Sequence, residues 1–522
     1  MTGPSAVTID GSPLSVADVV AVARDGAAVE IGPALADRMG PAREMVDRIV
    51  AEGATVYGIT TGFGALASVR VSPTEARQLQ HSLVLSHAAG MGPAVEPDVV
   101  RAMMLLRART LAAGVSGVRP VLVEGLVALL RARITPVVPE LGSLGASGDL
   151  APLAHVGAVL CGEGRALNAE GRSVAGAEAL AAAGLTPVVL EAKEGLALLN
   201  GTEGMLAHLC LALADLDRLL RTADVACAMT VEALLGTDAA YAPELHALRP
   251  HPGQAASAAN LRRLLAGSAI VASHGPHASG DTPGPPVDHA VQDAYSLRCA
   301  PQVHGASRDV VAFAAEVAGR ELASVTDNPV VLVDEEGGPG SVASTGNFHG
   351  QPLAFAADFC AIAMADLAAI SERRTDRLMD PARSQGLPAF LAVDAGVNSG
   401  FMLAHYTAAA AVNRLRTSAA PASIDSISTS GGQEDHVSMG WNAARKLFGS
   451  LRDAARVLAV EILCAAQALE LRELSPSHET QAVLARLRTE VPPLPVDRFL
   501  APDLAAAERL VWEGALLPDW LR

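Results

Sequence analysis

The residues EGMLAHLCLALADLDRLLRTADVACAMTVEALLG occupy positions 203–236 and contain no proline. Alanine and leucine dominate this run, and both are strong helix formers. The run therefore predicts a long helix that is buried or half-buried. Similar stretches follow at 352–378, 400–417 and 441–472. Together these four stretches predict a mainly α protein that is built around a bundle of long helices.

The overall composition also favours packed helices. Half of the 522 residues are hydrophobic, but only 3% are aromatic. Small aliphatic side chains let helices approach closely, whereas strands are enriched in β-branched and aromatic residues. Short β-like runs occur near Ile134–Val138, Val188–Leu190 and Val330–Val333. These runs are too few for a doubly wound sheet.

Charge and hydropathy exclude several classes of partner. The chain carries 39 basic and 56 acidic residues, a net charge of −17, which argues against a nucleic-acid partner or an acidic membrane. Mean hydropathy is high at +0.30, yet no uncharged apolar run reaches about 18 residues. Because apolar residues are abundant without a membrane span, we expect burial between the subunits of a homo-oligomer.

The cysteines and the first residues indicate a cytoplasmic protein. Six cysteines are scattered, and none forms a CxxC pair. This spacing predicts reduced, mostly buried thiols rather than disulfides or a zinc site. The segment from Met1 to Ala17 has no basic region of the secretory type. His274 and His277 share a loop without a nearby acidic or cysteine partner, so we expect no metal site.

Three Gly- and Pro-rich interruptions divide the chain, and they lie at 141–152, 250–290 and 334–350. Ordered loops between helices are common places for chemistry. The sequence predicts three parts, which are a mixed N-terminal domain at 1–200, a central long-helix bundle at 201–475 and a C-terminal helical cap at 476–522.

The segment GASGDLAPLAH at 145–155 has an ordinary and a chemical interpretation. The ordinary one is a glycine turn followed by a helix that Asp149 caps. The chemical one exists because glycine has no Cβ, so its nitrogen can approach the carbonyl two residues earlier. Attack of the Gly148 nitrogen on the Ala146 carbonyl closes a five-membered ring. Loss of the Ser147 hydroxyl as water then leaves an exocyclic methylene, which makes the ring a strong electrophile.

Long motifs in this chain resemble the aromatic amino acid ammonia-lyase family, and its histidine branch most closely. The resemblance covers about Tyr57 to Arg472 and rests on YGITTGFG at 57–64, GASGDLAPLAH at 145–155, LLNGT at 198–202, VQDAYSLRC at 291–299, GNFH at 346–349 and QEDHVSM at 433–439. It implies a long-helix bundle of the aspartase/fumarase-like superfamily type, with the cofactor loop in a smaller N-terminal mixed segment. It also implies a carbon–nitrogen lyase whose 4-methylidene-imidazol-5-one (MIO) group forms from Ala146-Ser147-Gly148, without metal or pyridoxal phosphate.

The same resemblance implies roles for individual catalytic residues. Tyr57 would be the base that removes the β-proton, and its phenolate must be stabilised because a free phenol has a pKa of about 10. Tyr295 would position the electrophile and help to move protons. Asn200 would hydrogen-bond the ring carbonyl or the amino-acid head group, and Phe348 would pack against the ring. Arg298 would hold the substrate carboxylate with its bidentate guanidinium.

Further residues are implied to bind the substrate. The pair Ser86-His87 is typical of the histidine branch, and His87 would hydrogen-bond a substrate imidazole. Glu434 would face a ring N–H, and its burial against a bare phenyl ring would be costly. Gln292 and Gln433 complete the implied set. Ordinary interpretations stay open, since His87 could be a core histidine and Glu434 a surface carboxylate.

The implied reaction is the non-oxidative elimination of ammonia from L-histidine to give trans-urocanate. Phenylalanine/tyrosine ammonia-lyase or 2,3-aminomutase chemistry with the same prosthetic group is the alternative, because Thr60 is common among those relatives. A catalytically silent helical assembly is a third interpretation, and the intact tripeptide argues against it. Family members build each active site from several subunits, so the resemblance implies a homotetramer with shared active sites.

Overall fold

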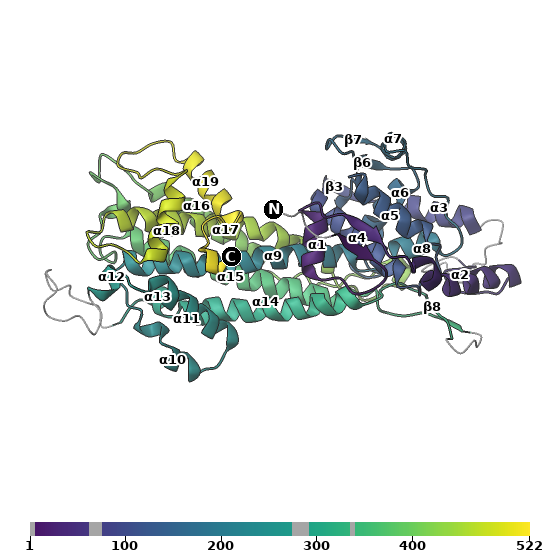
Figure 1. Ribbon diagram of the computed structural model, residues 1–522, viewed down its shortest axis with the longest axis horizontal. Coiled ribbons are helices and arrows are strands. Elements are labelled where there is room, and N and C mark those ends of the chain that lie inside the picture. The colour runs from purple at the N-terminus through teal and green to yellow at the C-terminus, as the bar shows by residue number, and fades with distance from the viewer. Residues whose placement is uncertain (1–5, 62–75, 274–291, 335–339) are drawn as a thin grey trace. The chain divides into compact units, whose positions relative to one another are not determined.

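The computed structural model describes residues 6–61, 76–273, 292–334 and 340–522. Helices dominate these residues, which contain nineteen α-helices and only short strands (Figure 1). The chain forms two compact units. The first contains Met1–Leu211, Ala315–Asp358 and Pro421–Arg445, and the second contains Ala212–Ala314, Phe359–Ala420 and Lys446–Arg522. The division into domains at 1–200, 201–475 and 476–522 stays a prediction.

The long helices that the sequence predicts are present. They are α9 (Glu203–Ala233), α15 (Gln351–Met379), α16 (Met402–Ser418) and α17 (Gly440–Glu470). A further long helix, α14 (Ala300–Ala323), escapes the sequence pattern because Gly305 and Gly319 interrupt its apolar run. The mainly α fold class is therefore confirmed.

The first unit carries all of the strands that the structure describes. Its helices are α1 (Val16–Ala23), α2 (Leu35–Glu52), α3 (Ala76–His87), α4 (Pro97–Ala112), α5 (Val121–Arg131), α6 (Leu150–Leu160), α7 (Gly176–Ala182) and α8 (Glu194–Leu199). Its strands are β1 (Val7–Ile9), β2 (Val29–Ile31), β3 (Met91–Ala94), β4 (Thr135–Pro136), β5 (Pro139–Leu141), β6 (Arg165–Leu167), β7 (Ser173–Ala175), β8 (Val330–Leu332) and β9 (Ser341–Ala343).

These strands form small separate sheets. β1 and β2 pair in parallel, with Val7 opposite Val29. The antiparallel sheets are β3–β5, β4–β6–β7 and β8–β9. The β-like runs near 134–138 and 330–333 therefore contain strands, whereas the expectation at 188–190 is wrong. Val188 instead donates its N–H to the Leu160 carbonyl at 3.0 Å, so this segment packs on the end of α6 without a strand partner.

The second unit is held by a buried network of charged side chains. Arg374 on α15 contacts Glu461 on α17 at 2.5 Å, and both side chains are fully buried. Asp224 on α9 accepts hydrogen bonds from His304 at 2.8 Å and from Arg308 at 2.6 Å, both on α14. Removing one partner of a buried ion pair is costly, so this network fixes the register of the helices. The remaining helices of this unit are α10 (Pro243–Ala247), α11 (Pro252–Leu265), α12 (Ala269–Ala272), α13 (Tyr295–Arg298), α18 (His478–Arg488) and α19 (Ala501–Trp512).

Helix α15 is unusually apolar. An 18-residue window in it has a mean hydropathy of 1.9, and among the helices of the described ranges it alone is long and apolar enough to cross a membrane. Within the protein 61% of this window is buried. Such burial is typical of the core helix of a globular protein.

Candidate active site

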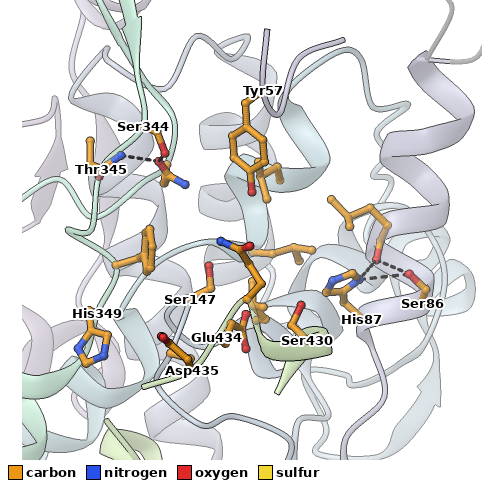
Figure 2. Close-up of a pocket in the computed structure, with 18 of the residues that line it drawn as sticks. Tyr57, Ser86, His87, Ser147, Ser344, Thr345, His349, Ser430, Glu434 and Asp435 are labelled. Atoms are coloured by element: carbon orange, nitrogen blue, oxygen red, sulfur yellow. Dashed lines mark hydrogen bonds between the residues drawn. The ribbon is translucent and has the colours of Figure 1, made fainter. Parts of the chain in front are cut away.

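A cavity of about 910 Å³ in the first unit collects most of the predicted site residues (Figure 2). Helices α3, α6 and α8 and several loops form its wall. Of the predicted residues, the wall contains Tyr57, Ser86, His87, Ala146, Ser147, Phe348, Gln433 and Glu434. The sequence motifs that carry these residues are far apart in the chain, so the fold brings them together.

The Ala146-Ser147-Gly148 loop is held against the segment that follows α8. Gly148 has a φ of +70° and forms a parallel β-bridge with Gly201. A Cβ at position 148 would lie 2.1 Å from the Gly201 carbonyl oxygen, so only glycine fits. The Asp149 N–H donates to the same oxygen at 2.7 Å. The backbone is thus fixed directly beside Ser147.

Asn200 is the hydrogen-bond partner of the Ser147 hydroxyl. It is 1% exposed and occupies the C-cap of α8. Ser147 Oγ donates to Asn200 Oδ1 at 2.9 Å, and Asn200 Nδ2 donates to the Asn328 carbonyl oxygen at 2.8 Å. The second bond fixes the orientation of the amide, with its oxygen toward Ser147. Asn328 also lines the cavity, so it belongs to the site.

Asp149 does not cap α6 with its side chain, which corrects the sequence-based interpretation. The carboxylate is fully buried and accepts hydrogen bonds from Ser143 Oγ and from the Met205 N–H, each at 2.8 Å. The Met205 bond satisfies an N–H in the first turn of α9, where no intrahelical partner exists. Burial raises the pKa of Asp149 to about 7, although the two hydrogen bonds oppose this shift.

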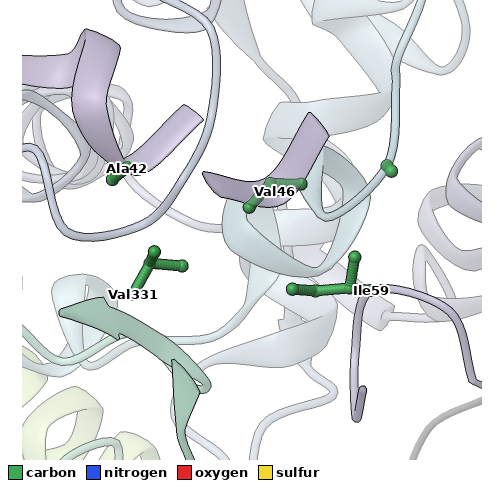
Figure 3. Close-up of a cluster of buried hydrophobic side chains, with 5 residues drawn as sticks. Ala42, Val46, Ile59 and Val331 are labelled. Carbon is green, nitrogen blue, oxygen red and sulfur yellow. The ribbon is translucent and has the colours of Figure 1, made fainter. Parts of the chain in front are cut away.

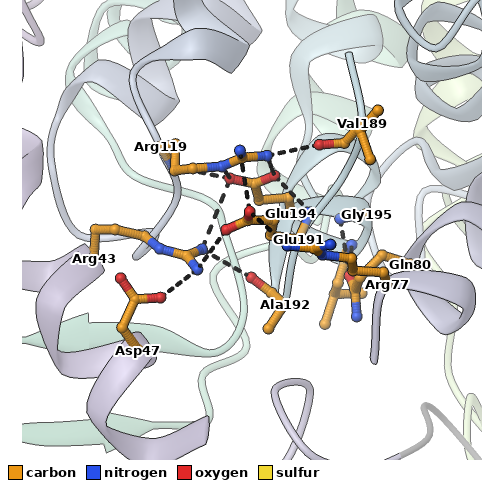
Figure 4. A network of polar contacts seen from close by, with 11 residues as sticks. Arg43, Asp47, Arg77, Gln80, Arg119, Val189, Glu191, Ala192, Glu194 and Gly195 are labelled. Carbon is orange, nitrogen blue, oxygen red and sulfur yellow. Dashed lines mark hydrogen bonds and ion pairs between the residues drawn. The ribbon is translucent and has the colours of Figure 1, made fainter. Parts of the chain in front are cut away.

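A buried polar network joins α3 to α8 (Figure 4). Gln80 on α3 is fully buried, and its Oε1 accepts hydrogen bonds from the N–H groups of Gly195 at 2.8 Å and Leu196 at 3.2 Å. These N–H groups lie in the first turn of α8 and lack intrahelical partners. Glu194 is also buried and contacts the Arg119 guanidinium at 2.7 Å. The network therefore fixes α3, which carries His87 and part of the cavity wall, against α8.

Tyr57 lies in a turn at 57–60, and its phenol points into the cavity (Figure 2). Gly58 has a φ of +74°, and a Cβ there would lie 2.9 Å from the side chains of Leu196 and Pro329. Ile59 is buried in a cluster of apolar side chains (Figure 3), and its neighbours there are Ala42, Val46, Ala192 and Val331. Packing against Leu196, Pro329 and this cluster therefore holds the turn in place. Residues 62–64 of the same motif lie outside the described residues.

His87 ends α3 and faces the same cavity as Glu434. Its Nδ1 lies 2.9 Å from the Leu83 carbonyl oxygen. Burial lowers the pKa of His87, although the Leu83 carbonyl and Glu434 oppose this shift. Because a carbonyl oxygen only accepts, Nδ1 carries the proton of the neutral ring and leaves Nε2 as an acceptor. Glu434 Oε2 accepts a hydrogen bond from Thr429 Oγ1 at 2.8 Å, which holds the carboxylate.

Three predicted residues belong to the second unit and do not line this cavity. Gln292 is exposed, and the Tyr295 side chain on α13 is 71% exposed. The Arg298 guanidinium carbon lies 4.6 Å from the centre of the Tyr295 ring. Arg298 Nε is buried without a hydrogen-bond partner. Tyr295 and Arg298 therefore form a local pair, and their place in a complete active site stays a prediction.

Sequence reasoning missed several polar residues of the cavity wall, which are Asn328, Ser344, Thr345, His349, Ser430, Asp435 and His436. Asn328 precedes Pro329, a dipeptide that signals a turn. His349 and His436 stack with ring centres 5.8 Å apart, and both belong to motifs already noted, GNFH at 346–349 and QEDHVSM at 433–439. In the described ranges, no group of three His, Cys, Asp or Glu residues could hold a metal ion. His274 and His277 lie outside those ranges.

Comparison with known proteins identifies the class to which this fold and cavity belong. Residues 14–489 match the family described as aromatic amino acid lyase. The chain is 54% identical to histidine ammonia-lyase of Streptomyces griseus over 515 residues, which cover 98% of this chain and 97% of the relative. The chain belongs to the aromatic amino acid lyase family.

Solved structures agree with this assignment. Histidine ammonia-lyase from Trypanosoma cruzi has a TM-score of 0.88 at 38% identity, covering 99% of this chain and 96% of the other. Tyrosine aminomutase from Streptomyces globisporus has a TM-score of 0.90, also at 38% identity, covering 98% and 97%. The fold is therefore common to lyases and aminomutases, and the choice of substrate depends on the residues of the site.

Proposed function

We propose that this enzyme eliminates ammonia from L-histidine and releases trans-urocanate. The observation that carries the proposal is that His87 and Glu434 line the same cavity as Tyr57 and Ser147. A neutral His87 offers an acceptor at Nε2, and Glu434 offers a carboxylate, so either one suits the N–H of an imidazole. A bare phenyl ring would leave these half-buried acceptors without donors. The identity of 54% with the Streptomyces griseus relative supports the same substrate.

The tripeptide fits the MIO group that the family uses. Only glycine fits at position 148, because Gly201 occupies the space of a side chain. Ser147 carries the hydroxyl that must leave, and both Ser147 and Ala146 border the cavity. Ring closure between Gly148 N and the Ala146 carbonyl, with dehydration of Ser147, removes two water molecules from the chain. The group, once formed, supplies an electrophile that turns the amine into a better leaving group.

The chain's own side chains would bind the substrate and move its protons. The Tyr57 side-chain oxygen, directed into the cavity, would take the β-proton in its deprotonated form. Asn200, held by Asn328, would donate or accept a hydrogen bond beside the tripeptide. Arg298 would hold the carboxylate, and its buried Nε without a partner is a donor that such an anion satisfies. Tyr295 and Gln292 are close to Arg298 in the sequence and would enter the active site together with it.

A homotetramer with shared active sites would bring these two groups of residues together. Arg298 lies in the second unit and does not line the cavity, so we propose that a neighbouring subunit supplies α13. An apolar stripe on α15 supports oligomer formation, because Phe355, Phe359 and Ile362 recur on one helical face and are 40%, 44% and 45% exposed. Light scattering coupled to size-exclusion chromatography measures the number of subunits, and a monomeric active enzyme would contradict this arrangement.

We place the enzyme in the cytoplasm, with an amino acid as its small-molecule partner. All six cysteines are free thiols, which suits a reducing compartment. Burial raises the pKa of Cys210 and Cys227 to about 12, so these thiols are inert. Fractionation of the producing cells tests this location.

The decisive experiment incubates the purified enzyme separately with histidine, tyrosine and phenylalanine. We expect urocanate absorbance with histidine and no comparable product with the other two amino acids. The similarity to tyrosine aminomutase favours a β-amino acid product as the second candidate, and chromatography of the products detects it. Tyr57→Phe should lower kcat by about 10²–10⁴-fold, as expected for loss of a general base.

A further inference from the structure

A second cavity of about 670 Å³ lies in the first unit, and it shares no residue with the active-site cavity. The turn between α1 and β2, the start of α4, the end of α5 and the loop after β6 form its wall. Four arginines line it, which are Arg24, Arg101, Arg131 and Arg133, and Asp25 is the one acidic residue of the wall.

The partners of these arginines leave most of the positive charge uncompensated. Arg24 forms an ion pair with Asp98 at 2.9 Å. Arg101 donates from Nε at 2.7 Å and from Nη2 at 2.5 Å to the Ala23 carbonyl oxygen. A carbonyl oxygen accepts these hydrogen bonds but does not neutralise the cation. Burial lowers the pKa of Arg101, the Asp98 carboxylate opposes this shift, and the neighbouring Arg133 adds to it, so the two guanidinium groups repel each other across the wall.

Arg131 and Arg133 complete the cluster. Arg131 donates from Nε to the Val29 carbonyl oxygen at 2.8 Å. Among the described residues, the Arg133 side chain has no hydrogen-bond or ion-pair partner, and its Nη2 lies 3.9 Å from the position that a Cβ on Gly26 would take. Among the residues that the structure describes, no carboxylate lies within ion-pair distance of Arg101, Arg131 or Arg133. Three cations therefore meet at one cavity in a protein whose net charge is −17.

We propose that this cavity binds the phosphate group of a small phosphate ester. Guanidinium groups match the oxygens of phosphate with paired N–H donors, and Arg101 and Arg131, which are anchored on carbonyl oxygens, lose little entropy on binding. A dianion would also relieve the repulsion between Arg101 and Arg133. Apolar side chains, which are Val22, Leu130 and Leu167, line the rest of the wall and would contact the organic part of the ester. The volume exceeds that of a free phosphate ion, which favours an ester over the inorganic ion.

Calorimetric titration of the full-length enzyme with inorganic phosphate and with adenosine 5′-monophosphate tests the site. We expect both to bind, with the ester tighter. Arg133→Asn should weaken binding of both at least about tenfold, because a charge-assisted hydrogen bond is lost. Asn tolerates the positive φ of 53° at this position, so the variant keeps the backbone. Arg48→Gln is the matched control, since Arg48 is exposed on α2 and lies outside this wall.

Four results of these titrations would overturn the proposal or a part of it. Absence of binding by both probes in the wild type overturns the proposal. Equal binding by the wild type and Arg133→Asn overturns it too, because the anion then lies elsewhere, for example near Arg298. Binding of phosphate without binding of the monophosphate ester overturns the ester assignment. An equal weakening in Arg48→Gln would show a general charge effect and would also overturn the site.

Discussion

The Ser147 hydroxyl donates a hydrogen bond of 2.9 Å to the Asn200 side-chain oxygen. Asn200 cannot turn its amide without losing the bond from Nδ2 to the Asn328 carbonyl. The Ser147 hydroxyl is therefore held by the residue that ends α8, and the tripeptide and α8 act as one structural element. This relationship connects the loop at 146–148 to the part of the cavity wall that α3 forms, because α8 also packs on α3.

Ser147→Ala should leave the fold intact and abolish turnover, because alanine has no hydroxyl to lose as water. Intact-protein mass spectrometry should find the variant chain at its unmodified mass, whereas the wild type should be lighter by two water molecules. Tyr57→Phe is the matched control, since it should keep the loss of two waters while turnover falls. A variant Ser147→Ala with wild-type rates would remove the tripeptide from the reaction.

His87→Leu should lower kcat/KM for histidine more than for tyrosine. The change removes the acceptor that we propose for an imidazole N–H, and such a loss costs about 1–3 kcal/mol, or about 5–150-fold in rate. Steady-state kinetics with both substrates measures the ratio, and Glu434→Gln should act in the same direction. Equal losses on both substrates would show that His87 supports the fold of α3 rather than the choice of substrate.

Local pattern predicted some features of this protein, and tertiary contacts decided the others. The Ala- and Leu-rich runs predicted α9, α15, α16 and α17, because helix propensity acts within one segment. The segment 188–190 has strand-forming residues but no partner strand, so pattern alone misassigned it. Motifs located Ser147 and His87 in one cavity through the family resemblance. They could not find Asn328, which enters the site through its backbone carbonyl.

Gln80 shows a second limit of sequence reasoning, and it gives a stability prediction. Nothing local marks this residue as buried, yet its Oε1 holds two N–H groups of α8. Gln80→Leu should lower the free energy of unfolding by about 1–3 kcal/mol, because buried donors lose their acceptor. Gln78→Leu is the control, since Gln78 is exposed on the same helix. Denaturant unfolding of both variants measures the difference, and equal stabilities would contradict the role of Gln80.

Asp149 should make stability depend on pH. Its pKa is about 7 in the folded protein and 3.8 as a free side chain, so the folded state binds more protons between these values. The free energy of unfolding contributed by this group therefore falls as pH rises from about 4 to about 7. Asp149→Asn removes the titration while the amide can still meet Ser143 and Met205. We expect the melting temperature of the wild type to fall more between pH 5 and pH 8 than that of the variant.

Tyr241 positions the helix that carries Tyr295 and Arg298. Its hydroxyl is fully buried and donates to the Leu297 carbonyl at 2.9 Å, while Arg374 Nη1 donates to the Ser296 carbonyl at 3.3 Å. The α13 helix has only four residues, so these two bonds replace the support that a longer helix would have.

Tyr241→Phe should lower kcat/KM about fivefold, since one buried hydrogen bond contributes about 1 kcal/mol and its loss lets α13 shift. If Arg298 binds the substrate carboxylate, the loss should appear as a higher KM. Tyr406→Phe is the control and should leave KM unchanged, because the Tyr406 ring is 62% exposed on α16. Steady-state kinetics and melting temperatures should be measured on both variants. A lower melting temperature with unchanged kinetics would mean that Tyr241 stabilises the second unit without positioning Arg298.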